Sequence, residues 1–145
     1  MTEPRVTIEQ IQELLERTIP LSRVLRVRID ALELGVARVT LPGSAEHTRA
    51  GGTLSGPAIM ALADTAIYAA VMTRIGIEPM ALTSDLSVRF LRRPAPEDLH
   101  AEARVLHLGR RTAVAEVRMW SASDPDRLVA HATGTYALPA DRSTE

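Results

Sequence analysis

The alternation of apolar and polar positions predicts a short helix followed by a hairpin at the start of the chain. Residues 7–10, Thr-Ile-Glu-Gln, form a capping box that opens an amphipathic helix, and Pro20 ends it. Residues 25–31 then alternate strictly between apolar and polar, which is typical of a half-buried strand. The turn residues at 33–35 and the apolar run at 36–41 predict a second strand, paired with the first.

The middle of the chain predicts a loop and then a long apolar helix. Residues 42–56 are rich in glycine and proline and are expected to form the loop. Pro57 suits the first turn of a helix, with Ser55 or Gly56 as its cap. The helix is expected to continue to about Arg74, and Gly76 stops it.

The remainder of the chain predicts four strands with short connections, which allow antiparallel neighbours. They are expected at residues 80–91, 97–108, 111–121 and 127–138. Ala130, Ala132 and Gly134 share one face of the last strand, where small residues let a helix approach closely. The sequence therefore predicts one α+β domain over residues 1–145, with a core at about 20–138. Its antiparallel sheet of about six strands curls around the long helix, and a short N-terminal helix is added.

Asp64 is the only charged residue between Arg49 and Arg74, within a run that is otherwise almost wholly apolar. An ionised carboxylate in a buried helix is costly unless it is paired, hydrogen-bonded or reactive. This makes Asp64 the leading candidate for a functional residue. The structural alternative is a buried acid bonded to the backbone or to its neighbours Thr65 and Tyr68.

Composition excludes several kinds of chemistry. The formal net charge of −1 argues against a general binder of nucleic acid or acidic membranes. The chain has no Cys and no Lys, so thiol nucleophiles, disulfides, cysteine-ligated zinc and Schiff-base lysines are excluded. We expect no metal, because the four histidines (His47, His100, His107 and His131) show no metal-ligand spacing, and we expect no cofactor. The polar start and the charged centre of the apolar run predict a soluble, cytoplasmic protein.

Three segments together resemble the hotdog-fold acyl-CoA thioesterases, in the PaaI-like branch of the 4-hydroxybenzoyl-CoA thioesterase superfamily. The first is Gly-Gly-Thr-Leu-Ser-Gly-Pro-Ala-Ile-Met-Ala-Leu-Ala-Asp-Thr-Ala at residues 51–66. The second is the strand at residues 83–95, and the third is His-Ala-Thr-Gly-Thr-Tyr at residues 131–136. The resemblance covers about residues 20–138.

The resemblance implies roles for three catalytic residues. Asp64 would be the nucleophile or the general base that activates water, and the backbone N–H of Gly56 would polarise the thioester carbonyl. Thr83 would help to hold the attacking water, although an ordinary strand threonine is the alternative. The chain departs from the family pattern at Ser55, which replaces a histidine, and at Arg49, which replaces an asparagine.

The pattern of the strand predicted at residues 80–91 indicates on which side of it the Thr83 side chain lies. Simple alternation places Thr83 on the side opposite Leu82, Leu86, Val88 and Phe90.

The spacing of Asp64 and Gly56 predicts a dimer. Eight residues of helix span about 12 Å, so one carbonyl carbon cannot lie close to both groups of the same helix. The two groups must come from different chains whose helices run antiparallel. This agrees with the obligate dimer that the resemblance implies, and we expect a homodimer with further pairing into a homotetramer.

Arginine side chains are the candidates for binding the phosphates of coenzyme A, since a guanidinium pairs with phosphate in bidentate fashion. The candidate substrate-binding residues are Ser55, Arg49, Arg92, Arg93, Arg110 and Arg111. The alternatives are a helix cap for Ser55 and solvated surface charges for the arginines.

The predicted function is an acyl-CoA thioesterase with an acyl-CoA substrate. The alternative is a hotdog module that binds acyl-CoA without catalysis, as a sensor or scaffold. A hotdog dehydratase is the weakest hypothesis, because no histidine lies at the helix motif. The sequence does not specify the acyl group.

Overall fold

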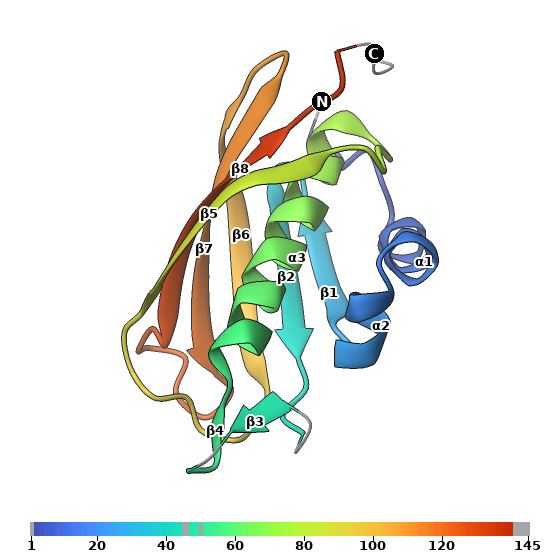
Figure 1. The fold of residues 1–145 in the computed structure, drawn as a ribbon. Helices are drawn as coiled ribbons and strands as arrows, with labels where there is room; N and C mark the ends of the chain where they lie inside the picture. The colour runs from blue at the N-terminus through green and yellow to red at the C-terminus, as the bar shows by residue number, and fades with distance from the viewer. Residues whose placement is uncertain (1, 45–46, 50, 141–145) are drawn as a thin grey trace.

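A six-stranded antiparallel sheet curves around the long helix α3, and this confirms the predicted α+β architecture (Figure 1). The computed structural model describes residues 2–44, 47–49 and 51–140. The strands of the large sheet follow the order β1-β2-β6-β7-β8-β5. The elements are α1 (Ile8–Thr18), α2 (Pro20–Leu25), β1 (Arg28–Glu33), β2 (Val36–Leu41), β3 (Thr48–Arg49), β4 (Thr53–Leu54), α3 (Gly56–Ile75), β5 (Leu82–Phe90), β6 (Leu99–Leu108), β7 (Thr112–Ser121) and β8 (Ala130–Ala137).

Helix α3 begins and ends at capping residues that the sequence indicates. The Ser55 side chain accepts a hydrogen bond from the N–H of Ala58 at 3.3 Å, and Gly76 caps the other end. The helix is long and apolar enough to span a membrane by length and composition, but 67% of its most apolar window is buried within the fold. Burial to that extent is what the core helix of a globular domain requires.

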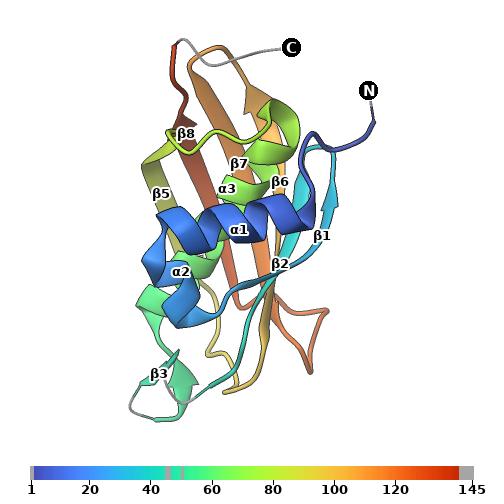
Figure 2. The same cartoon turned by 90° about the vertical axis from the view of Figure 1, so that its right-hand side faces the viewer.

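The N-terminal region differs from the prediction in one element. The capping box at Thr7 is present and α1 ends near the predicted place, but Pro20 also opens a second helix, α2. Helix α2 stops because Arg26 adopts a left-handed conformation, with φ of 60°. The first strand therefore begins at Arg28 instead of Leu25. Helices α1 and α2 lie across the open side of α3, next to β1 (Figure 2).

A β-bulge in β5 reverses the predicted direction of Thr83. In the pairing of β5 with β8, Ser84 is skipped immediately after Thr83. An extra residue shifts the alternation of side chains by one. Thr83 therefore shares the helix-facing side with Leu86, which lies against Gly134 beside α3, and Phe90, which lies against Gly56 at the start of α3. The prediction that Thr83 points away from these two residues is wrong, whereas Leu82 does lie on the other side.

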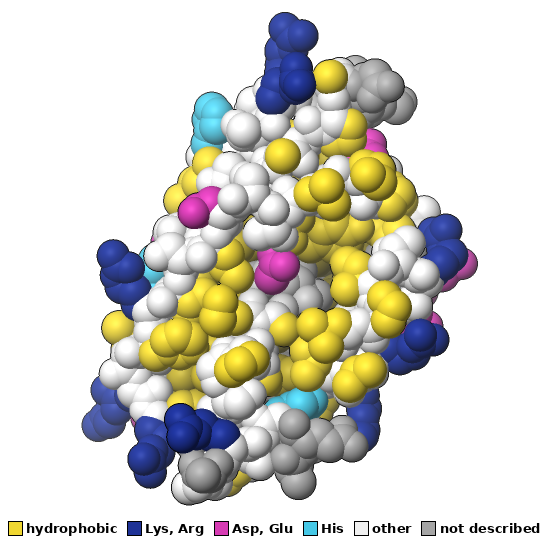
Figure 3. Space-filling model, in the orientation of Figure 1, with side chains coloured by type: hydrophobic (Ala, Val, Ile, Leu, Met, Phe, Trp, Pro, Cys, Tyr) yellow, Lys and Arg dark blue, Asp and Glu magenta, His cyan; other side chains and the backbone are white. Residues whose placement is uncertain are grey.

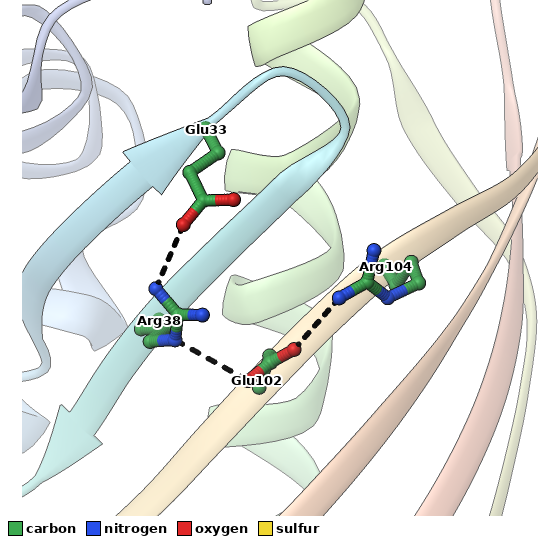
Figure 4. A network of polar contacts seen from close by, with 4 residues as sticks. All are labelled: Glu33, Arg38, Glu102 and Arg104. Carbon is green, nitrogen blue, oxygen red and sulfur yellow. Dashed lines mark hydrogen bonds and ion pairs between the residues drawn. The ribbon is translucent and has the colours of Figure 1, made fainter.

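The face of the sheet away from α3 is polar. Arg38 on β2 contacts Glu33 and Glu102, and Arg104 contacts the other oxygen of Glu102, each at 3.2 Å (Figure 4). The hydrogen bond to Glu33 raises the pKa of Arg38. Exposed ion pairs of this kind contribute little to stability, about 0–1 kcal/mol each. The network keeps this face solvated and leaves the chemistry to the concave side.

The close approach of α3 to β8 depends on Gly134, as the run of small residues predicts. A Cβ added there would lie 2.7 Å from Ile67 Cδ1 and 3.2 Å from the backbone oxygen of Asp85. We expect Gly134→Ala to lower the free energy of unfolding by about 1–3 kcal/mol, because it overpacks this contact. Urea denaturation measures the change.

The matched test is the double variant Gly134→Ala with Ile67→Val, which deletes the nearest methyl group. It should lose less stability than the sum of the two single variants. Simple additivity would contradict the role assigned to this contact.

Candidate active site

Two hydroxyl groups fix the Asp64 carboxylate through one of its oxygens. Thr83 Oγ1 donates to Asp64 Oδ1 at 2.8 Å, and the Tyr136 hydroxyl donates to the same oxygen at 2.7 Å. Among the residues that the structure describes, no hydrogen bond reaches Oδ2. Asp64 is half-buried at the surface of α3. The carboxylate is thus oriented, and its second oxygen is available to a reactant.

The partners of Asp64 differ from those that the structural alternative proposed. Thr65 donates its hydroxyl to the Ala61 carbonyl at 2.8 Å, so it is turned back along the helix. The Tyr68 ring packs near Tyr136, with 5.9 Å between the ring centroids. The acid is therefore held by the sheet, through β5 and β8, and not by its neighbours on the helix.

Tyr136 was missed as a site residue by reasoning from the sequence. It is 3% exposed, and its hydroxyl also lies 3.1 Å from the backbone oxygen of Asp64. Burial, followed by the negative charge of Asp64, raises the pKa of Tyr136 far above its ordinary value. The phenol therefore stays protonated and acts as a hydrogen-bond donor. Tyr136 lies directly opposite Thr83 in the β5–β8 pairing, so the register of these two strands is the signal that could have found it.

A small cavity of about 90 Å³ adjoins Asp64. Its walls come from α1 and α2 on one side and from α3 and β8 on the other. The lining residues are Leu15, Ile19, Leu21, Ser22, Leu25, Ala61, Asp64, Thr65, Tyr68 and Tyr136. The missed helix α2 thus forms part of the site.

Gly56 borders a second and larger cavity, of about 490 Å³. It is the first residue of α3, where backbone N–H groups lack helical partners. Arg49, Arg92 and Arg93 line the same cavity, so three of the predicted substrate-binding arginines gather around Gly56. Phe90 of β5 forms a further part of the wall.

The other predicted binding residues, Ser55, Arg110 and Arg111, are not among the residues that line this cavity. Ser55 caps α3 through the N–H of Ala58, which is its alternative interpretation. Arg110 and Arg111 form the turn between β6 and β7, at the end of the sheet where β8 finishes. Arg92 and Arg93 follow β5 at the opposite end, near the start of β8.

The two cavities separate the predicted catalytic groups within one chain. Asp64 borders the small cavity and Gly56 the large one, and the two residues lie about 12 Å apart along α3. The prediction that one chain cannot bring both groups to a single carbonyl is consistent with this arrangement.

The face that carries both cavities is apolar. Figure 3 shows hydrophobic side chains gathered over α3 and β5 in the orientation of Figure 1. Met60 on α3 is 40% exposed and Phe90 on β5 is 53% exposed. β5 is also an edge strand of the sheet. Exposed apolar side chains beside an unpaired edge are typical of an interaction surface.

No metal-binding group of three or more His, Asp or Glu side chains occurs within residues 2–44, 47–49 and 51–140. His131 contacts Glu116 at 3.0 Å, and His100 Nδ1 lies 2.8 Å from Thr40. His47 Nδ1 lies 2.7 Å from the carbonyl oxygen of Pro42. These three histidines therefore have structural partners away from Asp64.

Comparison with known proteins gives the same family at the level of sequence and fold. A family model described as the thioesterase superfamily matches residues 51–132, more than half of the chain. A "putative thioesterase" from Silicibacter sp. TM1040 has 36% identity and a TM-score of 0.85, with 94% of each chain covered. The phenylacetic acid degradation protein PaaI from Thermus thermophilus, in a mutant form, has 30% identity and a TM-score of 0.73. That match covers 83% of this chain and 99% of the other.

A curated relative extends the comparison to an archaeon. A "putative esterase" from Saccharolobus solfataricus is 30% identical over 131 residues, which cover 90% of this chain and 91% of the relative. These relatives favour a hydrolase over a module that only binds its ligand. The chain belongs to the thioesterase superfamily, in which it is a PaaI-like thioester hydrolase with the hotdog fold.

Proposed function

We propose that this protein hydrolyses acyl-CoA thioesters to a free acid and coenzyme A. The observation that carries the proposal is the Asp64 carboxylate, oriented by two hydroxyl donors on Oδ1 and open at Oδ2. Each active site would combine Asp64 of one chain with Gly56 of the partner subunit.

Asp64 Oδ2 would start the reaction in one of two ways. As a general base it takes a proton from water, and the water oxygen bonds to the carbonyl carbon. The C–S bond then breaks, and the proton passes to the thiolate sulfur. As a nucleophile it attacks the carbonyl carbon itself, and the C–S bond breaks to release the thiolate and leave an anhydride with Asp64. Water then cleaves the anhydride to the free acid and the Asp64 carboxylate, and a proton from that water passes to the thiolate. In both routes negative charge develops on the carbonyl oxygen, and the free N–H of Gly56 of the partner subunit would stabilise it.

Coenzyme A would extend away from the carbonyl through the larger cavity. The guanidinium groups of Arg49, Arg92 and Arg93 line that cavity beside Gly56, and they suit the phosphates of the nucleotide. Arg110 and Arg111 lie at the other end of the same sheet and are not needed in this arrangement. Coenzyme A is part of the substrate, so no separate cofactor enters the reaction.

The proposed dimer pairs the apolar faces over α3 and β5. A second copy would cover Met60 and Phe90 and would extend the sheet at the edge strand β5. It would also bring Gly56 of the partner subunit towards Asp64. Pairing of dimers into tetramers and a cytoplasmic location stay predictions from the sequence.

Replacement of the acid tests its role directly. We expect Asp64→Asn to lower kcat/KM by at least about 100-fold, because the amide cannot act as base or nucleophile. Release of coenzyme A, followed with a thiol reagent, measures the rate, and size-exclusion chromatography checks that the dimer persists. Asp126→Asn, an exposed acid in the turn before β8, is the matched control and should keep wild-type activity. Full activity in Asp64→Asn would contradict the role of Asp64 as base or nucleophile.

Removal of the two hydroxyl donors tests the orientation of Asp64. We expect Tyr136→Phe and Thr83→Val each to lower kcat about tenfold with little change in KM, since each loses one hydrogen bond to Oδ1. The double variant should lose less than the product of the two effects if the hydroxyls act as a unit on one oxygen. If each variant instead loses thermal stability in step with its loss of kcat, and the two losses simply multiply in the double variant, the hydroxyl groups have a packing role.

Mixing two inactive variants tests whether the site is shared. Asp64→Asn removes the acid, and Gly56→Leu places a bulky side chain where the carbonyl would lie. After random exchange of subunits, half of the dimers are mixed, and each mixed dimer keeps one intact site of two. We therefore expect recovery of about one quarter of the wild-type activity in an equimolar mixture.

A site contained in one chain would give the opposite result. Every chain in the mixture would then carry a broken site, and the mixture would stay as inactive as its parents. Native mass spectrometry on variants of different mass verifies that exchange has taken place.

A further inference from the structure

We infer that the small cavity beside Asp64 binds the acyl group and restricts the substrate to short, apolar acyl chains. This inference rests on the proposed function, because it assigns the acyl half of the same substrate.

The small cavity lies beside the proposed reacting group. Asp64 is one of its lining residues, so a carbonyl carbon under attack by Oδ2 lies at its edge. The larger cavity, with its three arginines, belongs to Gly56 and suits the coenzyme A half of the substrate. The acyl substituent on the other side of the carbonyl is then directed into the cavity between α2 and α3.

The hydroxyl groups in the walls of the cavity already donate hydrogen bonds within the protein. Ser22 donates its hydroxyl to the Ile19 carbonyl at 2.9 Å, and Thr65 donates to the Ala61 carbonyl at 2.8 Å. The Tyr136 hydroxyl donates to Asp64. These hydroxyl protons are already committed within the protein, so a hydroxyl on the acyl chain could donate to their oxygens but would find no donor for its own oxygen among them. The apolar side chains of Leu15, Ile19, Leu21, Leu25 and Ala61 form the rest of the lining apart from Asp64 and Tyr68, and the cavity therefore favours a hydrocarbon chain.

The volume of the cavity limits the size of the acyl group. Its volume of about 90 Å³ is well below the roughly 150 Å³ of an engineered protein cavity that holds benzene. At about three-fifths of that volume, the cavity has room for roughly three or four carbon atoms, against the six of benzene. Three methylene or methyl groups beyond the carbonyl correspond to a butanoyl chain. An aromatic ring or a long chain exceeds this space.

A panel of CoA thioesters tests the inference on the wild-type enzyme. The panel contains acetyl-, butanoyl-, octanoyl-, benzoyl- and 3-hydroxybutanoyl-CoA, with release of coenzyme A as the measured rate. We expect kcat/KM to be highest for butanoyl-CoA and lower by at least about tenfold for the octanoyl, benzoyl and hydroxylated substrates. A preference for octanoyl or benzoyl groups would overturn the inference.

Two variants connect the preference to the cavity. Leu21 lines the cavity but is 57% exposed, so Leu21→Ala should enlarge the space with little loss of stability and should raise the octanoyl-to-butanoyl ratio at least about fivefold. Ala61→Leu fills the cavity from α3 and should leave acetyl-CoA as the best substrate. Leu106→Ala, at an equally exposed leucine on β6, is the matched control and should leave the order of substrates unchanged.

The outcomes separate this inference from the proposed function. Hydrolysis of CoA thioesters with a chain-length profile that neither cavity variant changes would overturn the acyl site and leave the hydrolase intact. Failure of every CoA thioester in the panel would overturn both. A shift of the profile in opposite directions by Leu21→Ala and Ala61→Leu is the result that supports the acyl site.

Discussion

The geometry of the proposed active site follows from the length of one helix. A helix N-terminus offers N–H groups to a developing negative charge, and a carboxylate two turns further along offers a base or nucleophile. Within α3 these two groups are about 12 Å apart and border different cavities. A single thioester can use both only if a second copy of the helix runs in the opposite direction beside the first. The apolar face over α3 and β5 and the edge position of β5 are the features that such a pairing requires.

The sheet does more than support helix α3, because residues of β5 and β8 also orient Asp64. Gly134 lets α3 approach β8 closely, and the bulge after Thr83 turns that side chain toward the helix. Tyr136, opposite Thr83 in the pairing, adds the second hydroxyl to the same carboxylate oxygen. Three local features of β5 and β8 therefore determine how a residue on α3 is presented. The orientation of Asp64 is a property of the sheet and the helix together.

Much of the fold was predictable because its signals are local. The limits of α3 follow from Ser55 and Gly76, and the last four strands follow from alternation and short turns, within a few residues. Helix α2 was missed because it is only six residues long and opens at Pro20, which was interpreted from the sequence only as the end of the preceding helix. Asp64 stood out through its isolation among apolar residues. Tyr136 did not, because its contact with Asp64 joins residues 72 positions apart and depends on the register of β8.

The edge strand β5 connects the site to the solubility of the protein. An unpaired edge beside exposed apolar side chains is a template on which further strands can add, and this is a common start of aggregation. In the proposed dimer the same edge is covered by its own copy. The contact that completes the active site would then also cover this exposed apolar edge. Selection for turnover and selection against aggregation would act on the same residues of β5, so a substitution that weakens the pairing would reduce activity and solubility together.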